Sequence, residues 1–455
     1  MGRTPCVLTV AGSDSGGGAG IQADLKTISM LGCYGASVLT ALTAQNTAAV
    51  TDIHAPPPVF VAEQLRTVLS DISVDAVKTG MLFSEGIISE IAPLLSRADL
   101  PLVVDPVCVA TSGAKLLKDD AVDAMVRKIF PLADILTPNI PEAELFSGLT
   151  INDRDDVFKV AEVLLKMGPK SVLIKGGHSK SWAITDWFVE SGKEPIPFIQ
   201  QRVDTPNTHG TGCTLSAAIA TGLAQGESRA AAIQRAQRYL HLALRASYRL
   251  GEGGGPPNHI APWIKETARS TVLKELEQFA QWMQEERLEG VLGAEKSNIA
   301  ASIPYADALS DVASYSGGLI SSHTGQVFIA GVPEFGGKQA ISKALLTAQR
   351  FNAHLACGVS VSGNTLLKRV LHDLNSGVMW IERKLKPDYL SNDHGACAEW
   401  GVYEGLKKHV SPDEVRIIVD PGDMGCESRV YILEKDGARL RQLLLKLADL
   451  VSKQQ

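Results

Sequence analysis

The chain has 455 residues, of which 45% are hydrophobic and 21% are charged, and its formal net charge is −6. This length predicts two or three domains, and the acidic balance excludes the basic surface that a nucleic-acid partner requires. No apolar run is long enough to span a membrane, and the seven cysteines form no CxxC pair that would suggest zinc. With no signal-peptide pattern at the start, a cytoplasmic protein is expected.

The first stretch, residues 7–26, reads as a short apolar strand, a glycine-rich loop and a helix with Asp24 near its start. The glycine spacing matches neither the dinucleotide fingerprint nor a Walker A loop. The loop therefore either turns the chain or lets a flat ligand approach the backbone.

Apolar strand-like runs then alternate with helix-like runs as far as residue 177. The expected strands are 34–47, 75–81, 101–107, 135–137 and 171–177, and the expected helices include 60–71, 87–97 and 121–130. This alternation predicts an α/β fold, in which a parallel sheet is covered by helices on both faces.

Polar side chains stand at or just after the ends of these strands: Gln45, Asp105, Asn139, Glu142 and Lys175. Because parallel strands end at one rim of the sheet, these residues should gather there. The amide of Gln45 suits the edge of a nitrogen heterocycle, although a solvated loop amide would look the same. Asp105 and Glu142 offer oxygen ligands to Mg²⁺, and Lys175 offers a point charge to a phosphate.

The most informative stretch is 204–220, where Gly210-Thr211-Gly212-Cys213 precedes a helix of small apolar residues. Glycines expose backbone N–H groups, and the positive end of the helix dipole adds to them, so such a corner can bind an anion. A plain strand–turn–helix connection is the alternative. Together with the strand-end residues, the corner predicts a cradle for a magnesium-bound triphosphate.

The N-terminal half, from residue 5 to about 250, resembles the hydroxymethylpyrimidine/phosphomethylpyrimidine kinases of thiamine biosynthesis, which are ribokinase-like enzymes. The matching motifs are Ala11–Asp24, Thr43–Thr47, Val77–Met81, Asp105–Val107, Thr137–Asn139 with Glu142, Lys175–His178 and Asn207–Thr214. The resemblance implies that ATP phosphorylates the hydroxymethyl group of an aminopyrimidine, and then its monophosphate, with Mg²⁺ present.

The resemblance also assigns roles by position. It implies that Gln45 contacts the pyrimidine edge and that the ring pocket is lined by Gly12, Asp24, Met81 and Val107. It places the catalytic centre at Gly210, Thr211, Gly212 and Cys213, the ATP contacts at Lys175, Asn139 and Thr211, and the metal ligands at Asp105 and Glu142.

A thiol at a helix N-terminus is expected to have a lowered pKa, which would suit Cys213 as a proton acceptor, although it could merely fit a tight space. Thr79 and Thr111 stand where relatives often carry isoleucine and lysine, so nucleotide affinity is left open. A pyridoxal kinase is the alternative for this half, and Gln45 and Met81 favour the aminopyrimidine.

The glycine- and proline-rich segment 251–257 predicts the end of the kinase, with domains at 1–255 and 291–455. Between them lies an amphipathic helix, Thr271–Glu289, which should pack on one of the domains or bind a partner. Expected partners are small-molecule substrates, including a thiazole phosphate, and a second copy of the chain in a homodimer.

The second half is a mixed α/β domain that resembles thiamine-phosphate synthase at four segments: 296–301, 332–336, 399–401 and 418–425. Two basic positions of that family differ, since Pro421 and Cys426 stand where arginine and lysine are usual, and Gly337–Ala340 replaces a serine and a basic/histidine pair. A synthase and a non-catalytic sensor of thiamine phosphate both remain possible for this half.

Overall fold

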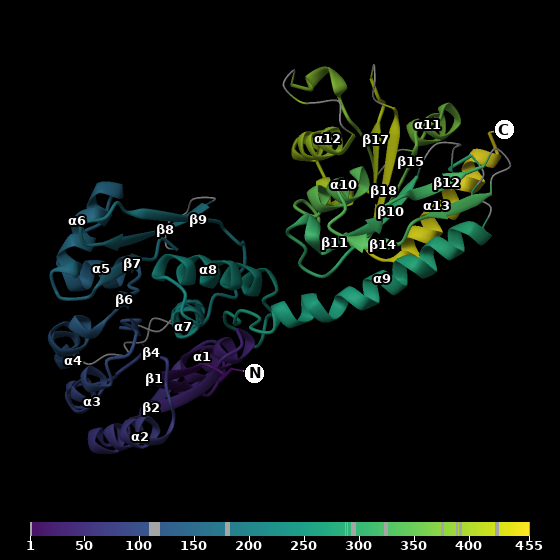
Figure 1. Cartoon of the computed structure of the whole chain (residues 1–455). Coiled ribbons are helices and arrows are strands. Elements are labelled where there is room, and N and C mark those ends of the chain that lie inside the picture. The colour runs from purple at the N-terminus through teal and green to yellow at the C-terminus, as the bar shows by residue number, and fades with distance from the viewer. Residues whose placement is uncertain are drawn as a thin grey trace. The chain divides into compact units, whose positions relative to one another are not determined.

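The computed structural model describes residues 2–108, 119–177, 183–286, 288, 290–292, 297–322, 326–374, 377–387, 390, 394–423 and 427–454. By its internal contacts the chain divides into two compact units, Met1–Trp263 and Ile264–Gln455 (Figure 1). The domain limits of 1–255 and 291–455 stay predictions.

A nine-stranded sheet forms the centre of the first unit, in the order β3-β2-β1-β4-β5-β6-β7-β8-β9. The central strands β2, β1, β4, β5, β6 and β7 run parallel, as predicted. At the two edges of the sheet, β3, β8 and β9 pair antiparallel. The strands are β1 (Cys6–Asp14), β2 (Tyr34–Gln45), β3 (Val50–His54), β4 (Ala76–Thr79), β5 (Leu102–Val104), β6 (Ile135–Leu136), β7 (Ser171–Ile174), β8 (Ala183–Glu190) and β9 (Ile196–Gln201).

Helices cover both faces of this sheet, as Figure 1 shows. One face carries α1 (Gly20–Met30), α7 (Thr211–Ala224) and α8 (Arg229–Arg245). The other face carries α2 (Pro58–Asp71), α3 (Glu85–Ala98), α4 (Asp119–Ala124) with the turns at Met125–Leu132, α5 (Ile140–Ser147) and α6 (Arg154–Leu165).

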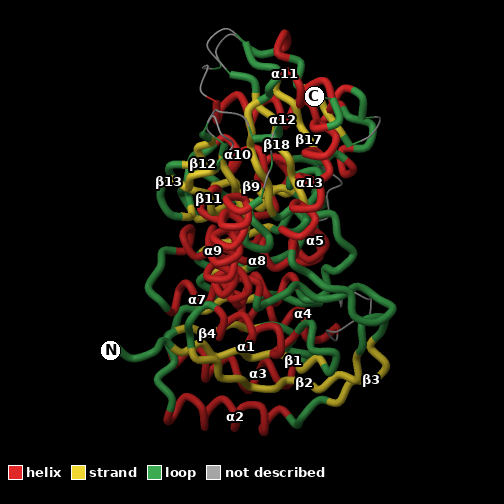
Figure 2. Tube along the Cα trace, turned by 90° about the vertical axis from the view of Figure 1, so that its right-hand side faces the viewer, coloured by secondary structure: helices red, strands yellow, loops and turns green. Residues whose placement is uncertain are grey.

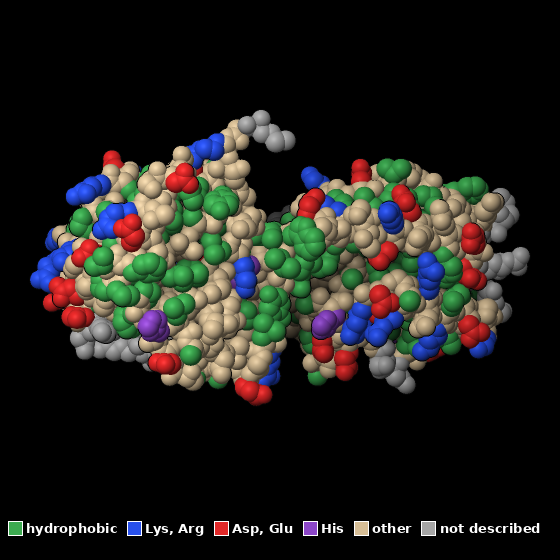
Figure 3. All heavy atoms as spheres, turned by 90° about the horizontal axis from the view of Figure 1, so that it is seen from below, with side chains coloured by type: hydrophobic (Ala, Val, Ile, Leu, Met, Phe, Trp, Pro, Cys, Tyr) green, Lys and Arg blue, Asp and Glu red, His purple; other side chains and the backbone are tan. Residues whose placement is uncertain are grey.

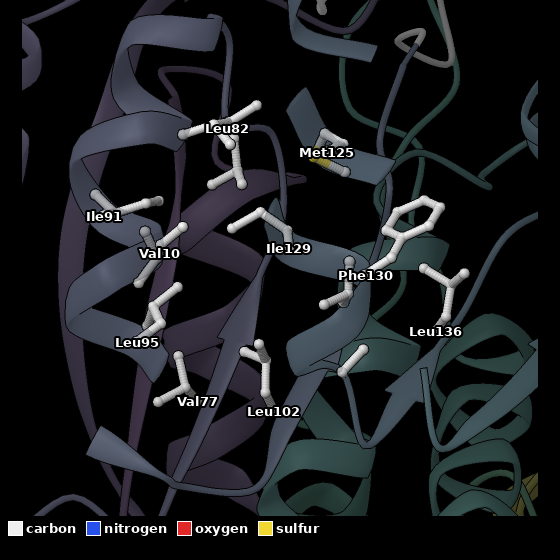
Figure 4. Packing of buried hydrophobic residues seen from close by; sticks show 14 of the residues in the cluster. Val10, Val77, Leu82, Ile91, Leu95, Leu102, Met125, Ile129, Phe130 and Leu136 are labelled. Atoms are coloured by element: carbon white, nitrogen blue, oxygen red, sulfur yellow. The ribbon is translucent and has the colours of Figure 1, made fainter. Parts of the chain in front are cut away.

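Alternation along the strands fills these two cores, because successive side chains point to opposite faces of a sheet. In β1, Leu8 and Val10 join the core under α3, while Val7 joins the core under α7. Figure 4 shows Val10 close to Ile91 and Leu95, and Ile129 and Phe130 turned in toward the same core. The strand ends that form the rim are thus supported by a buried hydrophobic core on each face of the sheet.

The second unit contains a seven-stranded sheet in the order β14-β11-β10-β15-β18-β17-β16, and all its pairs are antiparallel except β16–β17. Its strands are β10 (Asn298–Ser302), β11 (Val312–Tyr315), β14 (Pro333–Phe335), β15 (Cys357–Ser362), β16 (Val378–Trp380), β17 (Ile417–Asp420) and β18 (Arg429–Glu434), beside a hairpin of β12 (Gly318–Ser321) and β13 (Val327–Ala330).

Helices α9 (Ala261–Glu285), α11 (Thr365–His372) and α13 (Gly437–Ser452) pack on one face of this sheet. Helices α10 (Ala340–Ala348) and α12 (His394–Lys408) pack on the other. This confirms a second α/β domain, and it is built on antiparallel pairs.

The amphipathic helix begins at Ala261, so the predicted start at Thr271 was wrong. The apolar signal is strongest where Val272, Leu276, Phe279 and Met283 enter the second core, and the first turns carry scattered apolar positions such as Ala261 and Ala268. Figure 1 shows α9 as one continuous helix, and Figure 2, turned by 90°, looks nearly along it.

The surface agrees with the composition. On the face seen in Figure 3, Lys and Arg side chains are interspersed with Asp and Glu side chains. Among the described helices, none combines the length and apolarity needed to cross a membrane. The cysteines within the described ranges are free thiols.

Candidate active site

The strand-end residues do meet at one rim of the first sheet. Gln45 ends β2, Thr79 ends β4, Asp105 follows β5 directly, and Lys175 follows β7. Since these strands are parallel neighbours, their carboxyl ends open on the same side. Asn139 and Lys175 are joined by a parallel bridge beyond β6 and β7, which draws the last two segments together.

Asp105, Glu142 and Lys175 form the charged centre of this rim. The Nζ atom of Lys175 donates to Oδ1 of Asp105 at 2.8 Å, and Asp105 is buried. Burial opposes ionisation of Asp105, but the positive charges of Lys175 and Lys78 outweigh it and lower the pKa of Asp105. Burial, helped by the charge of Asp105, raises the pKa of Glu142 to about 7.

Glu142 is placed by the start of α5. Asn139 and Glu142 form a capping box, in which each side chain accepts from the backbone N–H of the other, at 2.9 Å in both directions. Burial and the nearby charge of Asp105 nevertheless outweigh the favourable charge of Lys175 on the Glu142 carboxylate. Two neighbouring carboxyls with that imbalance fit a divalent cation that keeps waters and phosphates as its other ligands. Among the described residues there is no cluster of three or more such metal-ligating side chains.

The glycine corner faces the same centre. A Cβ atom on Gly212 would lie 3.4 Å from Oδ2 of Asp105 and 3.5 Å from Nζ of Lys175. Gly210 has φ +82°, and a Cβ there would lie 1.9 Å from the carbonyl oxygen of Gly18. The first glycine-rich loop therefore packs directly on the corner, and only glycine fits at 210.

The prediction that the helix N-terminus lowers the pKa of Cys213 was wrong. Burial raises the pKa of this thiol to about 11, and the negative charges of Asp24 and Asp105 add to the increase. The positive charge of Lys78 lowers the pKa and offsets only part of these effects. Desolvation of the thiolate thus dominates the pKa of Cys213 in the ligand-free protein, even though the residue lies at a helix start.

Asp24 lies in a buried ion pair that the sequence did not reveal. Nζ of Lys78 donates to both its carboxylate oxygens, at 2.9 and 2.8 Å, and Thr9 Oγ1 donates to it at 2.5 Å. Both Lys78 and Asp24 are 0% exposed. The carboxylate therefore faces Lys78, and the ring contact that the resemblance implies for Asp24 would require this pair to open. In the sequence, the lysine within the apolar run 76–79 could have indicated a buried charge that needs a partner.

Of the other residues of the expected ring pocket, Gly12 and Met81 are brought together. A Cβ on Gly12 would come within 2.3 Å of Cε of Met81, so these two positions are in close contact. Val107 follows Asp105 by two residues and is half-buried. Gln45 is also half-buried, and its side chain lies next to His209 and Thr43, two residues to which the sequence analysis gave no role. Thr111, noted above for nucleotide affinity, falls outside the described residues.

In the second unit, the synthase-like segment 418–425 begins in β17, and its Asp420 lies where β17, β18 and β15 meet. Asp420 ends β17 opposite Arg429 at the start of β18, and Ser362 ends β15 beside it. The guanidinium of Arg383 donates to Asp420 at 2.7 Å through Nε and again through Nη2. Lys296 and Cys426 lie outside the described residues.

Comparison with family models decides the assignment. The model described as phosphomethylpyrimidine kinase matches residues 14–258, which is more than half of the chain. The chain belongs to this family. The model described as thiamine-phosphate synthase ThiN matches residues 275–446. The phosphomethylpyrimidine kinase unit is thus followed by a thiamine-phosphate-synthase-like unit, as the sequence motifs predicted.

Similar curated proteins carry matching names. A segment of 255 residues of this chain is 53% identical to the thiamine biosynthesis bifunctional protein ThiED of Geobacter sulfurreducens. The match covers 56% of this chain and 52% of that protein. The chain therefore spans about half the length of that relative. It is 48% identical over 266 residues to the hydroxymethylpyrimidine/phosphomethylpyrimidine kinase of Rhizobium meliloti, covering 58% of this chain and all of that protein.

Solved structures confirm the fold of the kinase unit. The pyridoxal kinase of Staphylococcus aureus in complex with AMP-PCP and pyridoxal is 34% identical, with a TM-score of 0.53, and covers 57% of this chain and 95% of that chain. An ADP complex of the Bacillus subtilis pyridoxal kinase gives the same TM-score and identity, with coverage of 57% and 99%. The unit thus has the ribokinase-like α/β fold, and both of these structures hold an adenine nucleotide.

Proposed function

We propose that the first unit transfers the γ-phosphoryl group of ATP to the hydroxymethyl oxygen of 4-amino-5-hydroxymethyl-2-methylpyrimidine, and then phosphorylates the monophosphate to the diphosphate. The supporting observation is the meeting of Asp105, Glu142 and Lys175 with the Gly210–Cys213 corner at one rim of the sheet. Such a site supplies the positioning and charge stabilisation on which phosphoryl transfer depends. The names of the relatives favour this substrate.

The residues have separate roles in this proposal. Lys175 neutralises phosphate charge, and the backbone from Gly210 to Cys213 stabilises the transferred group. Asp105 and Glu142 would hold Mg²⁺, which supplies charge neutralisation on the phosphates when it is bound. Cys213 accepts the proton of the hydroxymethyl group, which requires a thiolate.

A pKa of about 11 keeps Cys213 protonated at neutral pH in the ligand-free protein. The proposed role therefore needs added positive charge near the thiol. Within the protein, the Lys78 ammonium already acts in that direction, since its charge lowers the pKa of Cys213. This makes the buried Lys78 part of the proposed catalytic environment, while the charge of Asp24 acts in the opposite direction.

For the second unit we propose condensation of the pyrimidine diphosphate with a thiazole phosphate, which forms thiamine phosphate and releases pyrophosphate. The match of residues 275–446 to the synthase family supports it. The alternative is a non-catalytic unit that binds thiamine phosphate. Two observations favour this alternative. Pro421 stands where an arginine is usual, and Arg383 is already engaged with Asp420. Both reduce the number of cations available to bind phosphates.

The kinase-inactive variant Cys213→Ala separates these activities within the intact protein. Wild-type protein given ATP and the aminopyrimidine should form the monophosphate and then the diphosphate, and Cys213→Ala should form neither while still binding ATP. When Cys213→Ala is given the diphosphate and thiazole phosphate directly, thiamine phosphate can come only from the second unit. If none appears but calorimetry detects thiamine phosphate binding, the second unit is a binding module. Absence of pyrimidine phosphates with the wild type rejects the kinase proposal.

Pyridoxal is the second candidate substrate for the first unit. The observation that favours it is the 34% identity to pyridoxal kinases of known structure. A side-by-side assay of the two substrates at equal ATP concentration decides between them. We expect the larger kcat/KM with the aminopyrimidine.

A homodimer and a cytoplasmic location also remain proposals. Free thiols at the described cysteines are consistent with a reducing compartment. Light scattering after gel filtration measures the oligomeric state, and a mass of one chain would reject the dimer.

A further inference from the structure

Three side chains form a chain of contacts between the first glycine-rich loop and the catalytic corner. Nε2 of His209 lies 2.9 Å from Oδ2 of Asp14 and 3.4 Å from Nε2 of Gln45. His209 directly precedes Gly210, and both His209 and Asp14 are buried. Gln45 is the residue expected to read the edge of the pyrimidine, so its neighbours bear on substrate selection.

Asp14 determines where the imidazole carries a proton. Its carboxylate accepts backbone N–H groups from Gly16 at 2.8 Å, Gly18 at 3.0 Å and Ala19 at 2.8 Å. Burial opposes the charge, but the hydrogen bond with His209 and the backbone N–H groups of Ala19 and Gly16 outweigh it and lower the pKa of Asp14. An ionised carboxylate is only an acceptor, so Nε2 of His209 must carry hydrogen, whether the ring is neutral or protonated.

This assignment constrains the Gln45 amide. With its nitrogen toward His209, an NH₂ group would face an N–H group, and no hydrogen bond could form. The Gln45 oxygen and the Ser13 carbonyl oxygen would then compete for the one hydroxyl proton of Thr43. Oγ1 of Thr43 lies 3.1 Å from Oε1 of Gln45 and 2.9 Å from the Ser13 oxygen.

Turning the amide by half a rotation removes both conflicts. The oxygen of Gln45 then shares the Nε2–H of His209 with Asp14, as the longer branch at 3.4 Å, and the NH₂ group donates to Thr43 Oγ1, whose own proton goes to Ser13. The oxygen and nitrogen of an amide are assigned from such hydrogen bonding, and here each donor meets an acceptor only in the turned orientation. One oxygen lone pair and one N–H of Gln45 remain for a ligand.

We propose that His209, held as an Nε2–H donor by Asp14, orients the Gln45 amide and thereby selects the heterocycle edge that the kinase accepts. The inference rests on the proposed kinase function. The aminopyrimidine presents a ring-nitrogen acceptor beside an amino donor, which pairs with the N–H and the oxygen of the amide in one order only. His209 is a positioning residue, since it acts through Gln45.

The test compares the aminopyrimidine with its analogue lacking the 4-amino group. In His209→Leu the amide can turn freely, so we expect KM for the aminopyrimidine to rise about tenfold, the effect of losing one well-placed hydrogen bond. KM for the deamino analogue, which lacks the donor, should change much less, and so should KM for ATP. His209→Gln keeps an N–H donor near the Nε2 position and should restore discrimination between the two pyrimidines.

Equal effects on both pyrimidines, or no rescue by His209→Gln, would show a merely structural role and overturn the inference. Long-range ¹H–¹⁵N spectra of the imidazole give a readout independent of activity. Hydrogen on Nε2 is expected, and a tautomer with hydrogen on Nδ1 alone contradicts the inference. A wild type that binds neither pyrimidine rejects the proposed function as well. A wild type that phosphorylates the aminopyrimidine, with discrimination kept in His209→Leu, rejects the inference alone.

Discussion

Replacing Lys78 by methionine should destabilise the kinase unit strongly. The lysine pairs with Asp24 through two hydrogen bonds of 2.9 and 2.8 Å, and both side chains are 0% exposed. Methionine fills much of the volume but leaves Asp24 buried without its counter-charge. Removing one partner of such a pair costs about 3–5 kcal/mol. With a denaturant slope of about 3 kcal/mol per molar urea, the unfolding midpoint should fall by about 1–2 M.

Hydrogen exchange of peptides from β1 and β4, followed by mass spectrometry along a urea series, reports on the kinase unit within the intact chain. The double variant Lys78→Met/Asp24→Leu should recover most of the loss, because no unpaired charge remains. Thr9 loses its acceptor there, so a deficit of about 1–2 kcal/mol should persist. Lys159→Met breaks the exposed pair with Asp156 and serves as the control that should not move the midpoint.

The deficit should also depend on pH. Burial raises the pKa of Asp24, and loss of Lys78 raises it further. A carboxyl whose pKa is higher in the folded than in the unfolded state stabilises the fold at low pH and loses that contribution as pH rises through the folded pKa. The deficit of Lys78→Met should therefore shrink as pH falls toward about 4, the unfolded value for aspartate. A pH-independent deficit, or a double variant as unstable as the single one, would refute the buried-charge argument.

Three further predictions concern the rim. Because the pKa of Glu142 is about 7, the Mg²⁺ concentration for half-maximal turnover should rise as pH falls through 7, and Glu142→Gln should abolish that pH dependence; an unchanged profile in the variant excludes Glu142 as a ligand. Cys213 in the ligand-free protein should react slowly with iodoacetamide at pH 8 and faster as pH approaches 11, and mass spectrometry of the Cys213 peptide that shows rapid reaction at pH 8 would contradict the raised pKa. Gly210→Ala should abolish turnover, because its Cβ meets the Gly18 oxygen, whereas Gly226→Ala, with φ +83° and open space around it, should lose only about 1 kcal/mol of stability and keep its activity; equal losses of activity would refute the steric argument.

Much of the fold was predictable because its signals are local. Apolar runs of strand length between helical runs indicated the parallel sheet, and the end of each run located residues such as Asp105 and Lys175 at the rim. The strands β3, β8 and β9 were missed. They lie at or next to the sheet edges, and β3 and β9 are largely solvent-exposed, so they lack the continuous apolar pattern of the central strands.

By itself, the sequence determined the alternation of elements, the two glycine-rich turns and the kinase motifs, because each depends on residues close together along the chain. Only the tertiary structure decided how distant residues pair. Lys78 meets Asp24 across 54 positions, and His209 meets Asp14 across 195. The pKa of Cys213 was decided in the same way, since it is set by burial and by the charges of Lys78, Asp24 and Asp105, which lie far away along the chain. Pairing and desolvation depend on the three-dimensional surroundings of a group, and no local pattern in the chain encodes them.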